Sequence, residues 1–255
     1  MESSYKNLRV YNALMGFLHL AQGVAILVLS NNFKLPVNTT YLKFNQTLGV
    51  LEPTTKQLFQ VKFGILVAAF LFISAAAHLI IATIYYKKYQ QNLSRGINKA
   101  RWFEYAVSAS LMILLIGMLS GIYDASSLLM MFGLVAIMNL CGLLMELYNQ
   151  GREKVGWSAF IVGCLAGIIP WIVIAVYFWG AATNGGSNNI PTFVYWIYVS
   201  IFLFFNSFAI NMFLQYKKVG PWKKYLFGER VYILLSLTAK SALAWQIFVG
   251  TLRPM

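Results

Sequence analysis

The chain has 255 residues, of which 59% are hydrophobic and only 11% are charged. A soluble domain carries roughly 25% charged residues, so this composition excludes an ordinary soluble protein. The net charge of +13 at pH 7 would suit a nucleic-acid-binding protein. In a membrane protein, however, Lys and Arg set the orientation of the chain, and nucleic acid is not expected as a partner.

Long uncharged stretches predict an all-α membrane protein. Stretches without Asp, Glu, Lys or Arg cover residues 10–33, 63–86, 105–123, 125–145 and 155–216. Because a helix of about 20 apolar residues crosses a bilayer, we expect seven spans in one seven-helix domain over residues 1–255. They lie near 9–31, 60–86, 98–121, 125–147, 155–181, 191–216 and 230–252. The Gly-, Asn- and Pro-rich residues 184–191 predict the turn that divides the longest stretch.

The only long loop covers residues 32–59 and contains an alternating segment, Thr40–Asn45, which predicts a short β-hairpin. The two cysteines, Cys141 and Cys164, lie inside apolar stretches. We therefore expect them to pack in the core, without a disulfide.

The basic residues are distributed unevenly between the two ends of the predicted spans. Fourteen fall on one side: Lys6, Arg9, Lys87, Lys88, Arg95, Lys99, Arg101, Arg152, Lys154, Lys217, Lys218, Lys223, Lys224 and Arg230. Five fall on the other: Lys34, Lys43, Lys56, Lys62 and Arg253. Because the richer side faces the cytoplasm, the N-terminus is predicted to be cytoplasmic and the C-terminus extracellular, in the cell membrane.

The twentieth basic residue, Lys240, belongs to neither side. Nine uncharged residues precede it and twelve follow it, which places it about 14 Å from one end of its helix and about 18 Å from the other. A charge at that depth costs roughly 2.5–3.5 kcal/mol on insertion scales. Three roles are open: a lysine held for packing specificity, a cation-binding site, or a desolvated amine that forms a Schiff base with an aldehyde.

Among the seven acidic residues, Glu104 is the one expected inside a span, while the other six fall in tails, loops or span ends. It could pair with Arg101 at the start of its helix, or it could neutralise the charge on Lys240. Ser108 and Met112 follow Glu104 at helical spacing, and Ser236 precedes Lys240 by one turn. Two hydroxyls would then flank the ion pair.

The two histidines fall in the cytoplasmic halves of the first two spans. His19 has Gln22 one turn later, and His78 lies about eight residues from the inner end of its span. A histidine in a helix can simply be a core residue, but these two could also share a polar cavity that accepts a proton. The outer halves of the spans contain no Asp, Glu, Lys, Arg or His away from their ends, which argues against a pump for protons or cations.

Seven helices with a lysine in the middle of the last one resemble the microbial rhodopsins. A cytoplasmic N-terminus is similar to the heliorhodopsins among them. The motifs that carry the resemblance are Arg101-Trp102-Phe103-Glu104-Tyr105 with Ser108, and Ser236-Leu237-Thr238-Ala239-Lys240-Ser241. His19 with Gln22, and His78, also fit positions that the family uses, and the resemblance covers essentially the whole chain.

The resemblance implies a light sensor, not an enzyme, with all-trans retinal bound to Lys240 as a protonated Schiff base and Glu104 as the sole counterion. Ser108 and Ser236 would lie beside the Schiff base, and His19 and His78 would lie in the inner cavity. Met112, Met138, Trp171 and Phe208 are candidates for the chromophore wall. The resemblance also implies a homodimer that uses the first extracellular loop, and the basic inner face could dock a cytoplasmic signalling partner.

Two alternatives remain open at this stage. One is a light-driven or light-gated ion transporter within the same family, and the other is a seven-helix transporter without retinal. A G-protein-coupled receptor is disfavoured because its N-terminus would be outside and because the chain has no Asp-Arg-Tyr motif. No nucleophile–base pair or metal cluster is apparent, so neither enzymatic activity nor a metal is expected.

Overall fold

The computed structural model describes residues 2–184 and 191–254 and contains seven helices long and apolar enough to cross a membrane. The helices are α1 (Glu2–Leu29), α2 (Phe63–Ala82), α3 (Tyr86–Ser94), α4 (Lys99–Leu119), α5 (Ala125–Tyr148), α6 (Ser158–Asn184), α7 (Thr192–Tyr216) and α8 (Tyr225–Ile247). A short 3₁₀ helix, η1 (Gly220–Lys223), precedes α8, and a π-helical turn, η2 (Phe248–Leu252), follows it. Two strands, β1 (Lys34–Asn45) and β2 (Val50–Lys62), complete the fold.

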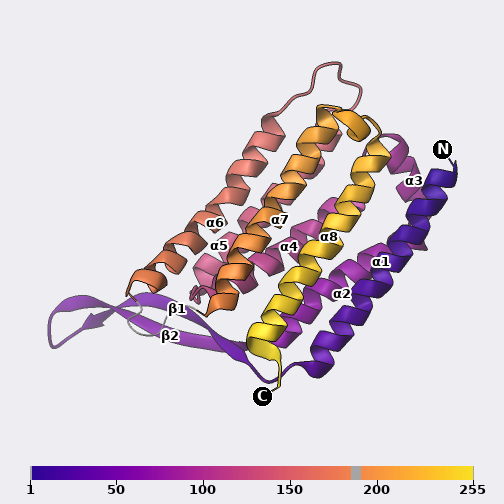
Figure 1. Ribbon diagram of the computed structural model, residues 1–255. Helices are drawn as coiled ribbons and strands as arrows, with labels where there is room; N and C mark the ends of the chain where they lie inside the picture. Colours follow the sequence, from indigo (N-terminus) through magenta and orange to yellow (C-terminus); the bar gives the residue numbers. More distant parts are fainter. Residues whose placement is uncertain (1, 185–190, 255) are drawn as a thin grey trace.

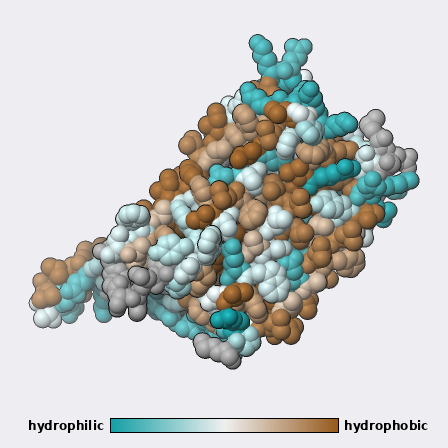
Figure 2. All heavy atoms as spheres, viewed as in Figure 1, coloured by the Kyte–Doolittle hydropathy of each residue, from teal (hydrophilic) through white to brown (hydrophobic). Residues whose placement is uncertain are grey.

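The seven membrane-length helices form one bundle, with α8 between α7 and α1 (Figure 1). The N-terminus lies at one end, and the C-terminus lies at the opposite end beside the hairpin. Hydrophobic residues predominate along the sides of the helices, and hydrophilic residues gather at the end that carries the N-terminus (Figure 2). The structure thus has the apolar belt that a bilayer requires, and the predicted all-α membrane fold is confirmed.

The predicted hairpin is present and much longer than expected. β1 and β2 pair antiparallel from Lys34↔Lys62 to Asn45↔Val50, with one irregularity between Val37 and Asn38. The Asn38 backbone N–H donates to the Tyr123 carbonyl at 2.8 Å, which ties the hairpin to the turn before α5. The alternation of Thr40–Asn45 indicated a hairpin but not its length, because backbone hydrogen bonds between the two strands extend the pairing beyond that segment.

Several boundaries and packing predictions differ from the structure. The helix α3, between the second and third spans, was not predicted, and α8 begins at Tyr225, five residues before the expected start. Of the two cysteines, Cys141 is buried as expected, but Cys164 is exposed on the outside of α6, since an apolar side chain can face lipid as well as a core. The predicted turn at residues 185–190 lies outside the described residues.

Candidate functional site

The side chains of Lys240 on α8 and Glu104 on α4 meet in the centre of the bundle. The Lys240 Nζ atom lies 2.7 Å from Glu104 Oε1, and the two side chains are only 4% and 6% exposed. Glu104 thus pairs with Lys240 and not with Arg101, which was the other partner considered for it. A buried charge needs an opposite charge and hydrogen bonds to offset the cost of its desolvation. Lys240 and Glu104 each provide an opposite charge and a hydrogen-bond partner for the other.

Three serines surround this ion pair. Ser236 accepts a hydrogen bond from Lys240 Nζ at 3.0 Å. Ser108 is fully buried one helical turn after Glu104, and its Oγ makes no hydrogen bond within the part of the chain that the structure describes. The third, Ser74 on α2, donates to Glu104 Oε1 at 2.7 Å and was missed by the sequence analysis. Its only sequence signal is its position one helical turn before His78, which places both residues on one face of α2.

The side chains of the two histidines lie together, one from α1 and one from α2. The His19 and His78 rings are stacked, with centroids 5.6 Å apart and planes 10° apart. His78 Nδ1 is 2.8 Å from the side-chain oxygen of Asn12, a buried residue that the sequence analysis did not single out. Gln22 does not join this group, because its side-chain oxygen accepts from Trp245 Nε1 at 3.0 Å near the bundle surface.

A second buried ion cluster lies closer to the end of the bundle that carries the N-terminus and corrects the sequence analysis. Arg101 forms ion pairs with both Glu146 on α5 and Glu229 on α8, and all three side chains are at most 4% exposed. Trp102 Nε1 also donates to Glu146 Oε2 at 2.7 Å. We expected Arg101 at the inner surface and both glutamates at span ends, but the packing of three helix ends buries them together.

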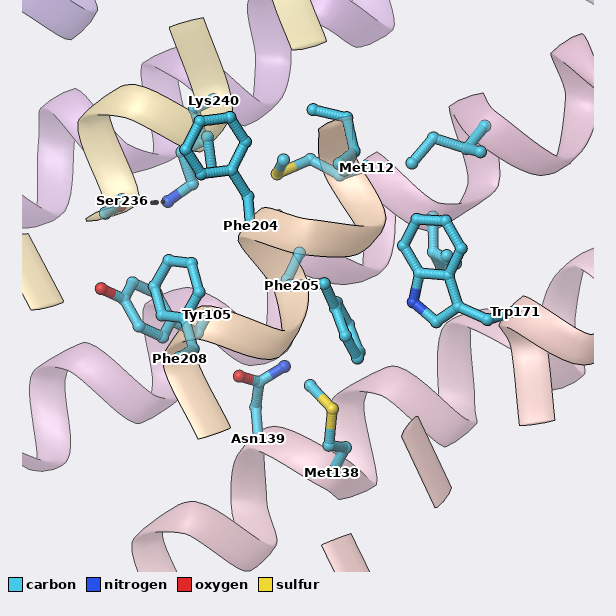
Figure 3. Close-up of a pocket in the computed structure, with 15 residues that line it drawn as sticks. Tyr105, Met112, Met138, Asn139, Trp171, Phe204, Phe205, Phe208, Ser236 and Lys240 are labelled. Carbon is cyan, nitrogen blue, oxygen red and sulfur yellow. Dashed lines mark hydrogen bonds between the residues drawn. The ribbon is translucent and has the colours of Figure 1, made fainter. Parts of the chain in front are cut away.

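An apolar cavity opens beside Lys240. Its lining comes from α4, α5, α6, α7 and α8 and comprises Tyr105, Ala109, Met112, Ile113, Ile116, Met138, Asn139, Trp171, Ile201, Phe204, Phe205, Phe208, Ser236, Ala239 and Lys240. Figure 3 shows Lys240 and Ser236 on one side of this cavity and Trp171 on the other. The four residues predicted for the chromophore wall (Met112, Met138, Trp171 and Phe208) all line it.

The polar groups of the cavity show which ligand chemistry it can accept. The Asn139 side-chain nitrogen already donates to the Val135 carbonyl of its own helix at 2.8 Å, which leaves the Lys240 amine as the reactive group on the wall. A primary amine in an apolar pocket can condense with an aldehyde. The residues therefore fit an elongated apolar aldehyde such as retinal, with its carbonyl carbon at Lys240.

Comparison with solved structures identifies the fold as that of the microbial rhodopsins. The crystal structure of a light-driven proton pump from Leptosphaeria maculans matches with a TM-score of 0.64 and 18% sequence identity. The match covers 98% of this chain and 95% of the pump chain. At that identity the match shows the fold alone.

The sequence model of the heliorhodopsins matches residues 8–252, so the chain belongs to the heliorhodopsin family. A comparison with curated protein sequences finds no match. Family and fold together make the chain a multi-pass membrane protein of the retinal photoreceptor type.

Proposed function

We propose that this protein is a light sensor that holds all-trans retinal as a protonated Schiff base on Lys240, with Glu104 as its counterion. The observation that carries the proposal is the buried Lys240–Glu104 pair at the wall of an apolar cavity. Retinal, when bound, supplies absorption of visible light and a change of shape after absorption. The chain supplies the attachment point, the opposite charge and the apolar enclosure.

The serines position the charged groups. Ser74 donates to Glu104 Oε1, the same oxygen that faces Lys240 Nζ. This shared contact fixes the carboxylate rotamer, so that the negative charge stays within hydrogen-bond distance of the nitrogen. Ser236 faces the same nitrogen from one turn earlier on α8 and is proposed to orient it.

His19 and His78 are the proposed acceptors for a proton released by light. Beyond their stacked rings, a small cavity on the inner side is lined by Asn12, His78 and Glu104 together with Asn98 and Arg101. A proton leaving Lys240 would therefore meet titratable groups on the inner side. Imidazole is suited to this exchange near neutral pH.

Signalling is favoured over ion transport because the outer halves of the spans contain no Asp, Glu, Lys, Arg or His away from their ends. Beyond Lys240, the cavity wall continues through Met112, Ile116 and Trp171, none of which can carry a proton. A transporter needs groups that exchange protons or bind ions along both half-paths, and this chain has them on one side. The pump from Leptosphaeria maculans shares the fold and lends no support to pumping here.

The remaining parts of the proposal concern orientation and partners. We place the N-terminus in the cytoplasm of a cell membrane because the basic residues gather at that end, and this face would contact a signalling partner. We also propose a homodimer with the hairpin at its interface, since Leu42, Leu48 and Leu51 are 63%, 65% and 60% exposed there. No enzymatic activity is part of the proposal.

The decisive experiment is to purify the protein after expression with retinal and to record its visible absorption. We expect a visible band that hydroxylamine removes under illumination, and mass spectrometry should find the retinylidene group on Lys240. Lys240→Ala should be colourless, whereas Lys88→Ala, at an exposed position on α3, should keep the band. A folded protein with unmodified Lys240 would overturn the proposal and favour a transporter without retinal.

A further inference from the structure

The bundle has a further hollow, which we call the α6 groove. It lies against α5, α6 and α7 and is defined by Cys141, Cys164, Leu165, Ala209 and Met212, among its other lining residues. Ala159 comes from the first turn of α6, and Met212 comes from the last two turns of α7. The groove therefore begins at the end of the bundle that carries the N-terminus and runs toward the middle.

One side of the α6 groove opens to the outside of the bundle. The lining residues Ile161, Cys164 and Leu165 are exposed on the surface of α6. Because α6 is one of the membrane-length helices, this opening faces hydrocarbon and not water. An empty hollow of this kind would forfeit dispersion contacts along its walls, so a molecule from the membrane is expected to fill it.

The side-chain nitrogens of the two asparagines in the groove already donate within their own helices. The side-chain nitrogen of Asn139 donates to the Val135 carbonyl at 2.8 Å, and that of Asn206 donates to the Phe202 carbonyl at 2.8 Å. The remaining walls are predominantly apolar or aromatic. The occupant that this chemistry accepts is a hydrocarbon chain without polar groups of its own.

A positive charge lies beside the inner end of the groove, one aromatic ring beyond its lining. The Lys217 Nζ atom lies 5.5 Å from the centre of the Trp157 ring and 5.8 Å from that of Phe213. Trp157 in turn packs against Phe160, which lines the groove, with ring centres 5.5 Å apart. An exposed lysine at this level is placed to attract the phosphate of an anionic lipid.

We infer that the α6 groove binds one acyl chain of an anionic phospholipid, with the lipid phosphate held beside Lys217. From Ala159 to Ile168, which both line the groove, α6 rises about 14 Å. That depth matches an acyl chain that fills half of a bilayer core of about 30 Å. The end of the chain would contact the wall of the cavity beside Lys240, because five residues line both hollows: Tyr105, Met138, Asn139, Phe205 and Phe208.

The test uses the full chain in nanodiscs that contain equal amounts of phosphatidylcholine and phosphatidylglycerol, followed by native mass spectrometry of the released protein. We expect one retained phosphatidylglycerol per protein. Ala209→Trp fills the groove from α7 and should abolish its retention. Ile210→Trp, at a neighbouring position that is 57% exposed and outside the groove, should retain it. Both variants are checked for a single symmetric peak in size-exclusion chromatography.

The charge beside the inner end of the groove is tested separately. Lys217→Gln should lower the preference for phosphatidylglycerol over phosphatidylcholine about fivefold, the effect of one basic residue near a membrane surface. Lys88→Gln, on α3, should leave the preference unchanged. Equal lipid retention by the parent and Ala209→Trp would overturn the proposal, as would a lipid-free dimer in which a second copy covers the groove. An unchanged preference in Lys217→Gln would overturn the assignment to an anionic lipid.

Discussion

Lys240 and Glu104 are separated by 136 positions in the chain, yet their charged atoms lie 2.7 Å apart. Burying either charge alone would cost free energy. Because the two charges are paired, two membrane-spanning helices can keep charged side chains in the interior of the bundle. Four predictions follow from this pair and from the other buried and capping groups of the fold.

Replacing Glu104 by Gln in the retinal-loaded protein should shift the visible absorption to longer wavelength. The carboxylate stabilises the positive charge on the nitrogen in the ground state, and its loss delocalises that charge along the chromophore. The variant should also lose the proton of the Schiff base at lower pH, which a pH series of spectra measures. Glu153→Gln, at an exposed position, is the control, and an unchanged spectrum in Glu104→Gln would remove Glu104 from the counterion role.

Replacing Arg101 by Leu should destabilise the protein by about 3–5 kcal/mol, because it leaves two buried carboxylates without their partner. Glu146 and Glu229 both pair with this guanidinium. Thermal unfolding in detergent should show the loss. Combining Arg101→Leu with Glu146→Gln and Glu229→Gln should recover most of the stability, since no unpaired charge then remains.

The matched control for this prediction is Arg95→Leu, because the Arg95 guanidinium is exposed and donates to the Gln150 side-chain oxygen at 3.2 Å. An exposed polar contact of this kind contributes little to stability. If Arg101→Leu and Arg95→Leu unfold at the same temperature, the buried cluster does not stabilise the fold.

Asp124 caps the N-terminus of α5, and its carboxylate accepts hydrogen bonds from the Ser126 side chain and the Ser127 backbone N–H. These bonds lower the pKa of Asp124 from its ordinary value of 3.8. A lowered pKa means that the cap stabilises the fold above about pH 4 and loses this contribution as the pH falls through the folded-state value. Asp124→Ala should cost about 1 kcal/mol at pH 7.

The variant Asp124→Asn separates the charge from the cap, because asparagine caps helices about as well as aspartate and does not titrate. Between pH 5 and the lowest pH at which the protein stays folded, the unfolding temperature of this variant should change less than that of the parent. Equal acid sensitivity in the parent and in Asp124→Asn would show that Asp124 does not contribute to the pH dependence.

Illumination of vesicles that contain the retinal-loaded protein should produce no change in the pH of the lumen. The expectation follows from the outer halves of the spans, which lack titratable residues of the kinds that carry protons in pumps. Vesicles with the Leptosphaeria maculans proton pump serve as the positive control. A sustained light-dependent pH change that a protonophore abolishes would support the transporter alternative.

Much of the fold was predictable because hydrophobicity is a local property. Five uncharged stretches and the length that a bilayer demands were enough to predict seven spans, and Lys240 was conspicuous because no other basic residue lies so far from a span end. The alternation in the first loop predicted a hairpin but not its length, since the far strand includes Pro53 and a less regular pattern. Helix α3 is short and polar, and it gave no comparable signal.

The sequence by itself therefore determined the class of fold and singled out Lys240, Glu104 and the two histidines, because an ionisable group in an apolar helix is visible without any partner. Only the tertiary structure decided which groups meet: that Ser74 shares the Glu104 oxygen with Lys240 and that Asn12 faces His78. It alone also decided that Arg101 is buried between Glu146 and Glu229. The physical reason is that each of these contacts joins residues on different helices, and helix rotation and packing, which no local pattern specifies, set their distances.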